Sequence, residues 1–139
     1  LVSNFDLKPL FKNQENIKII KDAMYSSSNE TGGTSYRSRL EDKRFTFAGK
    51  TGSSQIRKFT EAQREAEVKQ EQLKYENRDH ALFIAYAPVS DPKYAISVVV
   101  EHGGTGSKSA APIAKQVIKK VLERHSLRKS VNNLPGDSI

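Results

Sequence analysis

The chain has 139 residues, of which 36% are hydrophobic and 28% are charged, a composition that allows one domain with a buried core. Its net charge of +7 favours an anionic partner, without choosing between nucleic acid, a membrane surface and a cell-wall polymer. The absence of cysteine excludes disulfides, zinc–thiolate sites and a cysteine nucleophile. No apolar stretch approaches the roughly 20 residues of a membrane-spanning helix. The first residue, Leu1, suggests a piece of a longer protein.

A helix is the first element that the sequence predicts, after an irregular stretch over 1–12. Asn13 or Asn16 can cap its start, and it is expected to end near Ser27, where a polar run begins. Its apolar residues recur at helical spacing, and they are Ile17, Ile20, Ala23 and Met24. Serine, asparagine and glycine residues over 26–34 then predict a loop.

Three strands are predicted in the middle of the chain. An alternating run that starts at Arg44 predicts a strand over 44–51, with a continuation over 55–59 left open. The near-continuous apolar run 80–87 and the β-branched run 94–101 are the clearest strand patterns, and 89–93 forms a hairpin-like connection. Because both of these runs are apolar on both faces, we expect central strands that helices cover.

A charged segment and a final helix complete the predicted elements. About half of the residues over 61–79 are charged, with few apolar anchors, which indicates an exposed helix or a mobile insertion and favours partial disorder. The last helix is expected to start near Ser107 or Ser109, with Pro112 in its first turn. Its sheet-facing residues are expected to be Ile113, Val117 and Val121, with Ile118 and Leu122 beside them. Its basic face comprises Lys115, Lys119, Lys120 and Arg124. The order of elements predicts an α+β fold, an antiparallel three-strand sheet packed with helices.

The tripeptide Lys50-Thr51-Gly52 offers groups that suit acyl transfer, in which a nucleophile attacks a carbonyl and preplaced donors stabilise the oxyanion. Lys50 would supply positive potential and help to move the proton of the nucleophile. The Thr51 hydroxyl would hold a substrate carboxylate, and Gly52 would let the substrate backbone approach the strand. The N–H of Ser53 would donate to the oxyanion. Taken alone, the tripeptide is more often a strand end before a turn, since short motifs specify function loosely.

Four ordered blocks give this motif a context, and they are residues 48–55, 80–88, 98–106 and 110–114. In their order and spacing, the chain from about Ile17 to Leu122 resembles the end of the transpeptidase domain of a class B penicillin-binding protein. Within that family it is most similar to the elongation transpeptidases, the penicillin-binding protein 2 subfamily. The resemblance implies a partial penicillin-binding transpeptidase fold, which serine β-lactamases share.

The resemblance also implies a layout and an activity. Residues 1–125 would be the C-terminal portion of the transpeptidase domain, with the charged insertion 61–79, and 126–139 would be a loose polar tail. The full enzyme would cross-link peptidoglycan stem peptides through a serine acyl-enzyme, and β-lactams would acylate the same serine. The residues from Lys50 to Ser53 would take the roles given above, without a cofactor or a metal. The enzyme would work with cell-wall elongation proteins and not with nucleic acid. An N-terminal anchor absent from this chain would hold it in the inner membrane, with the catalytic domain in the periplasm.

One departure from the family pattern concerns the nucleophile. The family's Ser-x-x-Lys motif should lie far upstream of Lys50, but the two matches in this chain, Ser90–Lys93 and Ser126–Lys129, both follow it. The run Ser27-Ser28-Asn29 imitates the Ser-x-Asn motif, yet its position predicts ordinary helix-terminating residues. We therefore expect the chain alone to be inactive, and we expect it to associate through apolar surface that the missing part would cover.

The remaining alternatives concern the histidines and other classes of function. Structural or surface roles are expected for His80, His102 and His125, because no third metal ligand of suitable spacing accompanies them. A serine β-lactamase or a septal transpeptidase fragment stays open within the same fold. A small nucleic-acid-binding module would use the basic face of the last helix. A non-enzymatic interaction domain would use 61–79 for docking.

Overall fold

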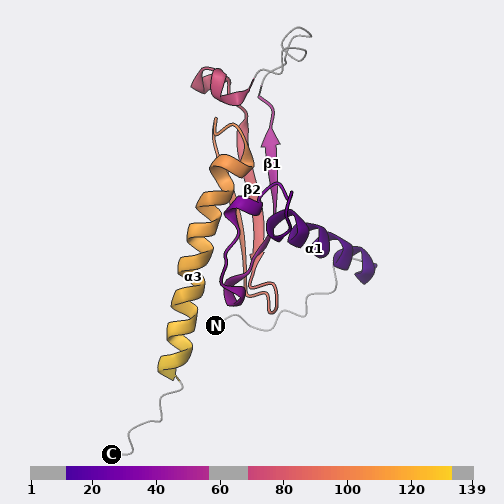
Figure 1. Cartoon of the computed structure of the whole chain (residues 1–139), viewed down its shortest axis with the longest axis vertical. Coiled ribbons are helices and arrows are strands. Elements are labelled where there is room, and N and C mark those ends of the chain that lie inside the picture. The colour runs from indigo at the N-terminus through magenta and orange to yellow at the C-terminus, as the bar shows by residue number, and fades with distance from the viewer. Residues whose placement is uncertain (1–11, 57–68, 133–139) are drawn as a thin grey trace, which may run out of the picture.

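The computed structural model describes residues 12–56 and 69–132 (Figure 1). Within these residues, the helices α1 (Gln14–Asn29) and α3 (Ala111–Asn132) flank the strands β1 (Ala48–Ser54), β2 (His80–Ala87) and β3 (Tyr94–Val100). Short 3-10 turns lie between these elements, at Tyr36–Ser38, Lys43–Phe45, Gln70–Gln72 and Tyr75–Asn77. A π-helical turn over Gly106–Ala110 leads into α3. No helix among the described residues is long and apolar enough to span a membrane.

The strands form an antiparallel three-stranded sheet in the order β1-β2-β3, which confirms the predicted α+β fold. In its register Lys50 lies opposite Ile84, and Ile84 lies opposite Ser97. Because side chains alternate between the two faces of a strand, these three residues share one face. We call it the open face. The other face carries Phe83 and packs against α3, and we call it the helix face.

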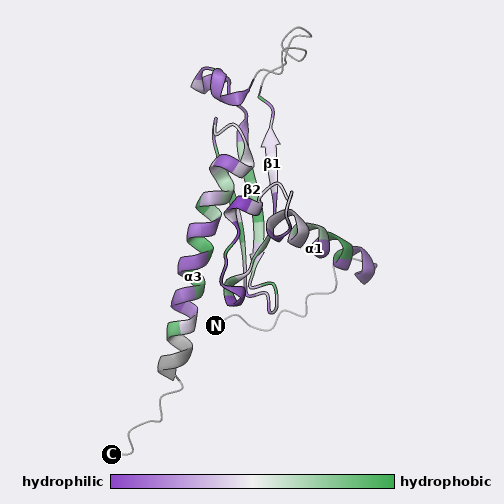
Figure 2. Ribbon diagram, in the orientation of Figure 1, coloured by the Kyte–Doolittle hydropathy of each residue, from purple (hydrophilic) through white to green (hydrophobic). Residues whose placement is uncertain are grey.

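The hydrophobic core lies between the helix face and α3. Its two largest side chains, Phe47 and Phe83, pack edge to face with ring centroids 6.0 Å apart. The other buried residues are small or aliphatic, and they are Ala81, Ala85, Ala87, Ala110, Ala111, Ala114, Ile118 and Leu122. Figure 2 shows the alternation of hydrophobic and hydrophilic residues along α3 that produces its buried stripe.

The predicted sheet-facing stripe of α3 is confirmed at Ile118 and Leu122 and is wrong at Ile113 and Val117. Ile113 and Val117 are each 44% exposed, whereas Ala114 is fully buried together with Ile118 and Leu122. The distance between packed elements depends on the side chains at the contact, and alanine lets the helix backbone lie close to the sheet. The larger residues Ile113 and Val117 therefore lie at the flank of the contact.

The open face is only partly covered. Met24 of α1 lies beside Ile84 and Tyr86, and the Lys21 ammonium lies 5.6 Å from the centre of the Tyr86 ring. Burial there raises the pKa of the Tyr86 phenol above its usual value. Beyond α1, Ile84 is 51% exposed and Val99 on β3 is 58% exposed. The prediction that both apolar strands are central and covered is therefore wrong for β3, whose outer edge pairs with no described segment.

Helix α1 begins as predicted but packs differently. Asn13 caps it, since its side-chain oxygen accepts a hydrogen bond from the Glu15 N–H at 2.9 Å. The helix runs to Asn29, two residues beyond the predicted end. Its predicted apolar face does not form a buried contact, because Ile20 is 56% exposed and Ala23 is also exposed. The last turn of α1 hydrogen-bonds the backbone at Gly49 of β1 and at Phe47, just before the strand.

The first strand starts later than the alternating pattern predicts. Lys43–Phe45 form a 3-10 turn, in which the Asp42 carboxylate accepts from the Arg44 N–H, and the strand begins at Ala48. The strand ends at Ser54, and most of its predicted continuation over 55–59 lies outside the described residues. The guanidinium of Arg44 also bonds the Asp42 carboxylate and lowers its pKa. This local capping competes with the extended conformation, so the pattern predicts strand where the chain turns.

Two other segments differ from the sequence predictions. Of the charged insertion 61–79, residues 61–68 lie outside the described residues, while 69–79 form two 3-10 turns rather than a helix or a disordered loop. The Gln70 side chain bonds both the N–H and the carboxylate of Asp79, at 2.9 and 2.8 Å, and fastens these turns. At the other end, α3 continues through 126–132, which were expected to be loose tail, and 133–139 lie outside the described residues.

Candidate active site

The predicted site residues occupy the middle of β1, which is an edge strand. Lys50 is exposed on the open face, where its ammonium donates to the Thr51 carbonyl at 2.9 Å. By strand alternation, Gly52 shares the face of Lys50, while Thr51 and Ser53 belong to the helix face. A ligand can therefore reach all four residues only along the outer edge of β1. That edge, rather than either face, is the candidate site.

The last turn of α1 holds the start of β1 through side chains that bond backbone. The Ser28 hydroxyl is fully buried, accepts from the Gly49 N–H at 3.0 Å and lies 3.2 Å from the Gly49 carbonyl. The Asn29 amide donates to the Phe47 carbonyl at 2.9 Å and also to the local Tyr25 carbonyl at 3.1 Å. Sequence reasoning assigned Ser28 and Asn29 only a helix-ending role and missed these long-range bonds. In the sequence, the only feature that could have indicated these bonds is the polar run at the end of an amphipathic helix.

A chain of hydroxyl groups reaches the motif itself. The Thr51 hydroxyl donates to the Thr34 hydroxyl at 3.2 Å, and Thr34 lies 3.1 Å from the Ser27 hydroxyl. The intervening turn comes very close to α1, because a Cβ at Gly33 would lie 2.4 Å from the Ser27 carbonyl oxygen. The glycine-rich loop therefore does more than reverse the chain. It brings Thr34 to the edge of β1, beside the hydroxyl that was predicted to hold a carboxylate.

The two glycines of β1 differ in what surrounds them. A Cβ at Gly49 would lie 2.3 Å from the Phe83 ring, so packing alone requires glycine there. A Cβ at Gly52 would meet only the Leu82 Cβ, at 3.4 Å, which is an ordinary van der Waals contact. The fold described here therefore accepts a side chain at Gly52. The turn before α3 lies against this part of β1, since a Cβ at Gly106 would come 2.8 Å from the Gly52 carbonyl oxygen.

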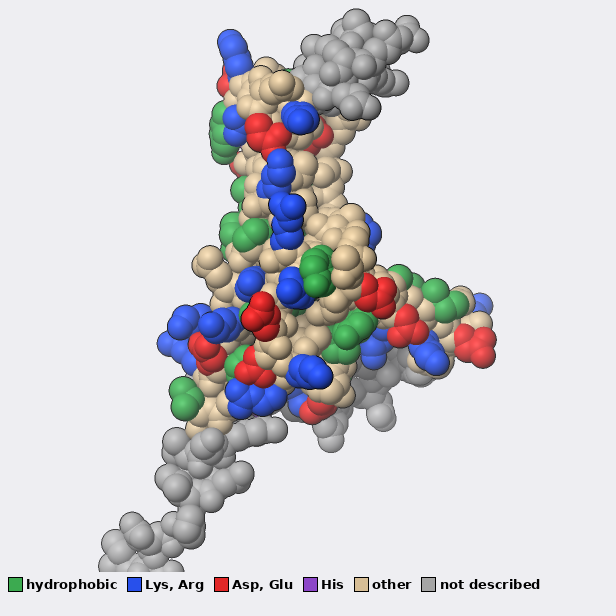
Figure 3. Space-filling view, in the orientation of Figure 1, with side chains coloured by type: hydrophobic (Ala, Val, Ile, Leu, Met, Phe, Trp, Pro, Cys, Tyr) green, Lys and Arg blue, Asp and Glu red, His purple; other side chains and the backbone are tan. Residues whose placement is uncertain are grey.

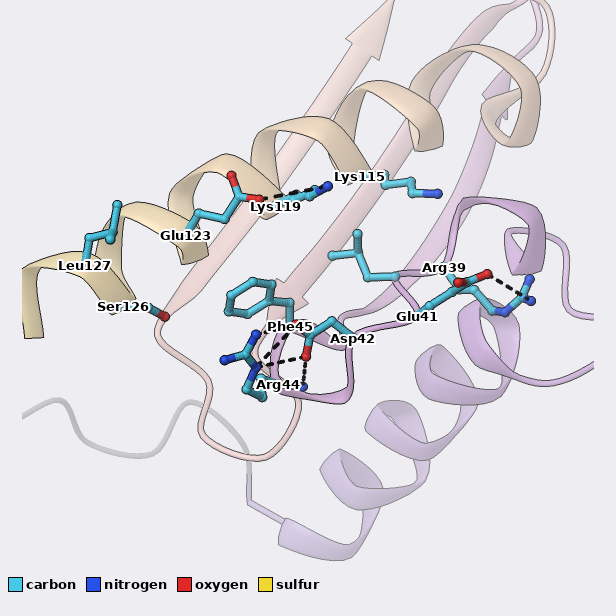
Figure 4. A pocket seen from close by; sticks show the side chains of 11 residues that line it. Arg39, Glu41, Asp42, Arg44, Phe45, Lys115, Lys119, Glu123, Ser126 and Leu127 are labelled. Carbon is cyan, nitrogen blue, oxygen red and sulfur yellow. Dashed lines mark hydrogen bonds and ion pairs between the residues drawn. The ribbon is translucent and has the colours of Figure 1, made fainter. Parts of the chain in front are cut away.

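Neither Ser-x-x-Lys match lies at the candidate site. Ser90 belongs to the connection between β2 and β3, where Lys93 pairs with Asp91 at 2.8 Å. Ser126 lies on α3 and lines a hollow of about 770 Å³ between α3 and the segment 39–45 (Figure 4). That hollow belongs to the helix side of the molecule, whereas Lys50 points from the open face. The structure therefore brings no Ser-x-x-Lys serine of the described residues to Lys50.

The basic face of α3 is neutralised in part by carboxylates. Lys119 and Lys120 both approach Glu123, at 3.9 and 3.5 Å. Across the hollow, Arg44 pairs with Asp42 at 2.7 Å, and Figure 3 shows blue and red side chains interspersed over this part of the surface. This arrangement does not form the unbroken basic stripe that typifies nucleic-acid-binding surfaces.

The histidines near the glycine turn make structural contacts. His102 has a positive φ of 52°. Its backbone N–H donates to Nδ1 of His80 at 2.9 Å, and its ring centroid lies 5.1 Å from that of Tyr75. Lys108 pairs with Glu71 and lowers the pKa of that carboxyl, which ties the 3-10 turns to the start of α3. His125 lies 2.8 Å from the Tyr94 hydroxyl. No group of three or more candidate metal ligands gathers among the described residues.

The antiparallel sheet, the Lys-Thr-Gly motif on its edge strand and the glycine turn before α3 together define a class of protein. Comparison with known proteins identifies that class. The family model of the penicillin-binding protein transpeptidase domain matches residues 9–119, and the chain belongs to this family. Within the family, its relatives include enzymes of the penicillin-binding protein 2 type.

Individual relatives support this placement. Peptidoglycan D,D-transpeptidase MrdA of Haemophilus influenzae is 35% identical over 115 residues, which are 83% of this chain and 17% of that protein. The structure of penicillin-binding protein 2 in complex with MreC from Helicobacter pylori has a TM-score of 0.63 and 30% identity, over 78% of this chain and 17% of that one. Penicillin-binding protein 2 of Pseudomonas aeruginosa, solved in complex with WCK 5153, has a TM-score of 0.57 and 29% identity, over 78% and 19%. The chain thus spans about a sixth of the length of these relatives.

Proposed function

We propose that this chain is the C-terminal portion of a peptidoglycan D,D-transpeptidase and supplies the Lys-Thr-Gly side of its catalytic groove. The observation that carries this proposal is the contrast between the two glycines of β1. Packing explains Gly49 but leaves Gly52 free to carry a side chain. A glycine that the fold does not need, on an open strand edge, suits a site where a substrate backbone lies against the strand.

The other residues of the motif then have separate roles. Lys50 supplies positive potential at the reacting centre and assists proton transfer from the nucleophile. The Thr51 hydroxyl, oriented by its bond to Thr34, binds the terminal carboxylate of the substrate. The N–H of Ser53 donates to the oxyanion as the tetrahedral intermediate forms. All three act along the outer edge of β1, which the substrate stem peptide would line as an added strand.

The nucleophile of this reaction lies outside the chain. A serine on an upstream segment would form the acyl-enzyme with a stem peptide, and β-lactams would acylate the same serine. The chain alone is then inactive. The whole enzyme would be anchored in the inner membrane, with its catalytic domain in the periplasm, and would work with cell-wall elongation proteins. The relative from Helicobacter pylori that was solved with MreC supports such a partner.

Labelling with a fluorescent penicillin tests the proposal. The chain alone should remain unlabelled, whereas a chimaera that joins it to the upstream part of the Haemophilus influenzae relative should be labelled covalently. In the chimaera, Lys50→Ala should slow labelling by about a hundredfold, the size of effect typical for loss of one stabilising group. Labelling of the chain alone would show that it contains a nucleophile and would overturn this assignment.

The two glycines provide a matched control. In the chimaera, Gly52→Ala should slow labelling at least about tenfold, because the new Cβ intrudes on the substrate, while its unfolding midpoint in urea stays unchanged. Gly49→Ala should instead lower that midpoint, since its Cβ would overlap the Phe83 ring. If Gly52→Ala labels at the normal rate, the outer edge of β1 is not the substrate site.

Loss of rod shape on depletion of the full-length protein would distinguish an elongation role from a septal one.

A further inference from the structure

Three hydroxyl groups lie in a row that ends at the candidate site. The Thr51 hydroxyl donates to the Thr34 hydroxyl at 3.2 Å, and Thr34 Oγ1 lies 3.1 Å from Ser27 Oγ. These residues come from three separate segments, namely β1, the glycine-rich loop and the end of α1. We call them the hydroxyl chain. It connects the Lys-Thr-Gly motif to side chains that precede it by 17 residues or more.

The loop holds Thr34 between two anchored neighbours. On one side, Gly33 lies so close to α1 that a Cβ would come 2.4 Å from the Ser27 carbonyl oxygen. On the other side, Ser35 is buried, and its N–H and its hydroxyl both donate to that same carbonyl at 3.0 Å. A side chain on such a fixed backbone loses little further freedom when it bonds a neighbour. Thr34 is therefore suited to orient the Thr51 hydroxyl.

Stability alone gives little reason for the hydroxyl chain. Thr34 is exposed and Thr51 is only partly buried, so water can compete for both hydroxyl groups. A hydrogen bond that merely replaces bonds to water contributes little to the free energy of unfolding. The hydroxyl chain is thus better suited to positioning than to stabilising the fold, and experiments can separate the two roles.

A bound carboxylate would change the direction in which the hydroxyl chain donates. A hydroxyl has one hydrogen and rotates it to suit its partners, whereas an ionised carboxylate only accepts. In the structure, Thr51 donates to Thr34. When Thr51 donates to a carboxylate instead, its bond to Thr34 persists only if Thr34 becomes the donor. Thr34 can then accept from Ser27, because either hydroxyl of that pair can donate.

We propose that Thr34 and Ser27 are positioning residues for the carboxylate-binding hydroxyl of Thr51, and that the hydroxyl chain reverses its direction of donation when a carboxylate binds. Donation then runs from Ser27 to Thr34, from Thr34 to Thr51, and from there to the carboxylate. Hydrogen bonds in such a series polarise one another, so each strengthens the next. The last bond is the strongest, since its acceptor is ionised. This inference rests on the proposed function, which gives Thr51 its carboxylate role.

The rate at which benzylpenicillin acylates the full-length protein tests the hydroxyl chain. Thr34→Val removes the hydroxyl but keeps the shape of the side chain, and it should slow acylation about tenfold. Thr34→Ser keeps the hydroxyl and should stay within about threefold of the wild-type rate. Thr31→Val, at an exposed position of the same loop, is the matched control and should leave the rate unchanged. Equal slowing by Thr34→Val and Thr34→Ser would overturn the inference, because the hydroxyl would then not be the group that acts.

Urea denaturation of the same variants separates positioning from folding. The unfolding midpoint should stay at its wild-type value in Thr34→Val, since the hydroxyl that it removes is accessible to water. A midpoint that falls together with the acylation rate would mean that Thr34 acts through the fold, against the positioning role.

A double-mutant cycle shows whether Thr34 acts through Thr51. Thr51→Val should slow acylation at least as much as Thr34→Val, and the double variant should show no further loss. A full additional loss would overturn the inference, because Thr34 would then act elsewhere. Slow acylation of Thr51→Val beside normal acylation of Thr34→Val would overturn the hydroxyl chain and leave the proposed function intact. Normal acylation of Thr51→Val would instead remove the carboxylate role itself, and the inference with it.

Ser27→Ala tests the far end of the hydroxyl chain. It should slow acylation by only about two- to threefold, because Thr34 keeps its own hydrogen and can still donate to Thr51. A larger loss than in Thr34→Val would contradict the order of the hydroxyl chain.

Discussion

At the scale of single residues, the candidate site depends on polar contacts made far along the sequence. The serine and asparagine that end α1 bond the backbone at Gly49, immediately before Lys50 in β1, and at Phe47, just before the strand begins. The Lys-Thr-Gly motif can be recognised in the sequence, but the hydrogen bonds that hold its strand in place cannot. Ser28 looks like a helix-ending residue in sequence, because such residues commonly bond local backbone. Only the approach of β1 gives its hydroxyl a distant partner.

Substitution of Ser28 should therefore destabilise the chain more than its small size suggests. Ser28→Ala removes the acceptor of the buried Gly49 N–H, and an unsatisfied buried donor costs about 1–3 kcal/mol in the free energy of unfolding. Urea denaturation followed by circular dichroism measures the change. Ser26→Ala, in the same turn, should stay within about 0.5 kcal/mol. Equal effects of the two substitutions would mean that Ser28 contributes only through the helix.

At the scale of elements, the packing of α3 shows how far periodicity predicts contacts. The pattern located the helix and correctly included Ile118 and Leu122 among its apolar residues. It placed Ile113 and Val117 at the sheet, because larger apolar side chains dominate such a pattern. The structure instead buries Ala110, Ala111 and Ala114. The small alanine side chains allow the helix backbone to lie close to the sheet, and the helical period alone does not show which residues make that contact.

A pair of substitutions one position apart on α3 tests this stripe. Ile118→Ala should lower the free energy of unfolding by about 2–5 kcal/mol, since it leaves a cavity in the core. Val117→Ala, at a 44% exposed position, should cost less than about 1 kcal/mol. Both should be measured by denaturation at low protein concentration, where self-association does not contribute. A larger loss for Val117→Ala would restore the stripe predicted from periodicity.

At the scale of the whole molecule, the sheet is covered by α3 on one face and only in part by α1 on the other. The open face exposes Ile84 and Val99, while α1 exposes Ile19 and Ile20. Exposed apolar patches in soluble proteins commonly mark interaction surfaces. The chain spans about a sixth of the length of the relatives it matches. The open face is also the one that carries Lys50.

Binding of a hydrophobic dye should report this surface directly. Anilinonaphthalene sulfonate should fluoresce with the natively folded chain, and Ile84→Lys should reduce its emission, because the substitution places a charge in the middle of the open face. Gln116→Lys, at an exposed position of α3, adds the same charge elsewhere and should leave the emission unchanged. An absence of dye binding to the wild-type chain would show that this face is covered in solution.

The sequence by itself determined the features that depend on local chemistry. Cap chemistry limits the start of α1 to Asn13 or Asn16, the apolar runs predict β2 and β3, and the four ordered blocks around Lys-Thr-Gly indicate the family. Which strand lies at an edge, which stripe of α3 is buried and which partner Ser28 finds were decided by the tertiary structure. The physical reason is that burial and hydrogen bonding join residues distant in sequence. The contrast between Gly49 and Gly52 is the clearest example, since only the position of Phe83 shows which of the two glycines the fold requires.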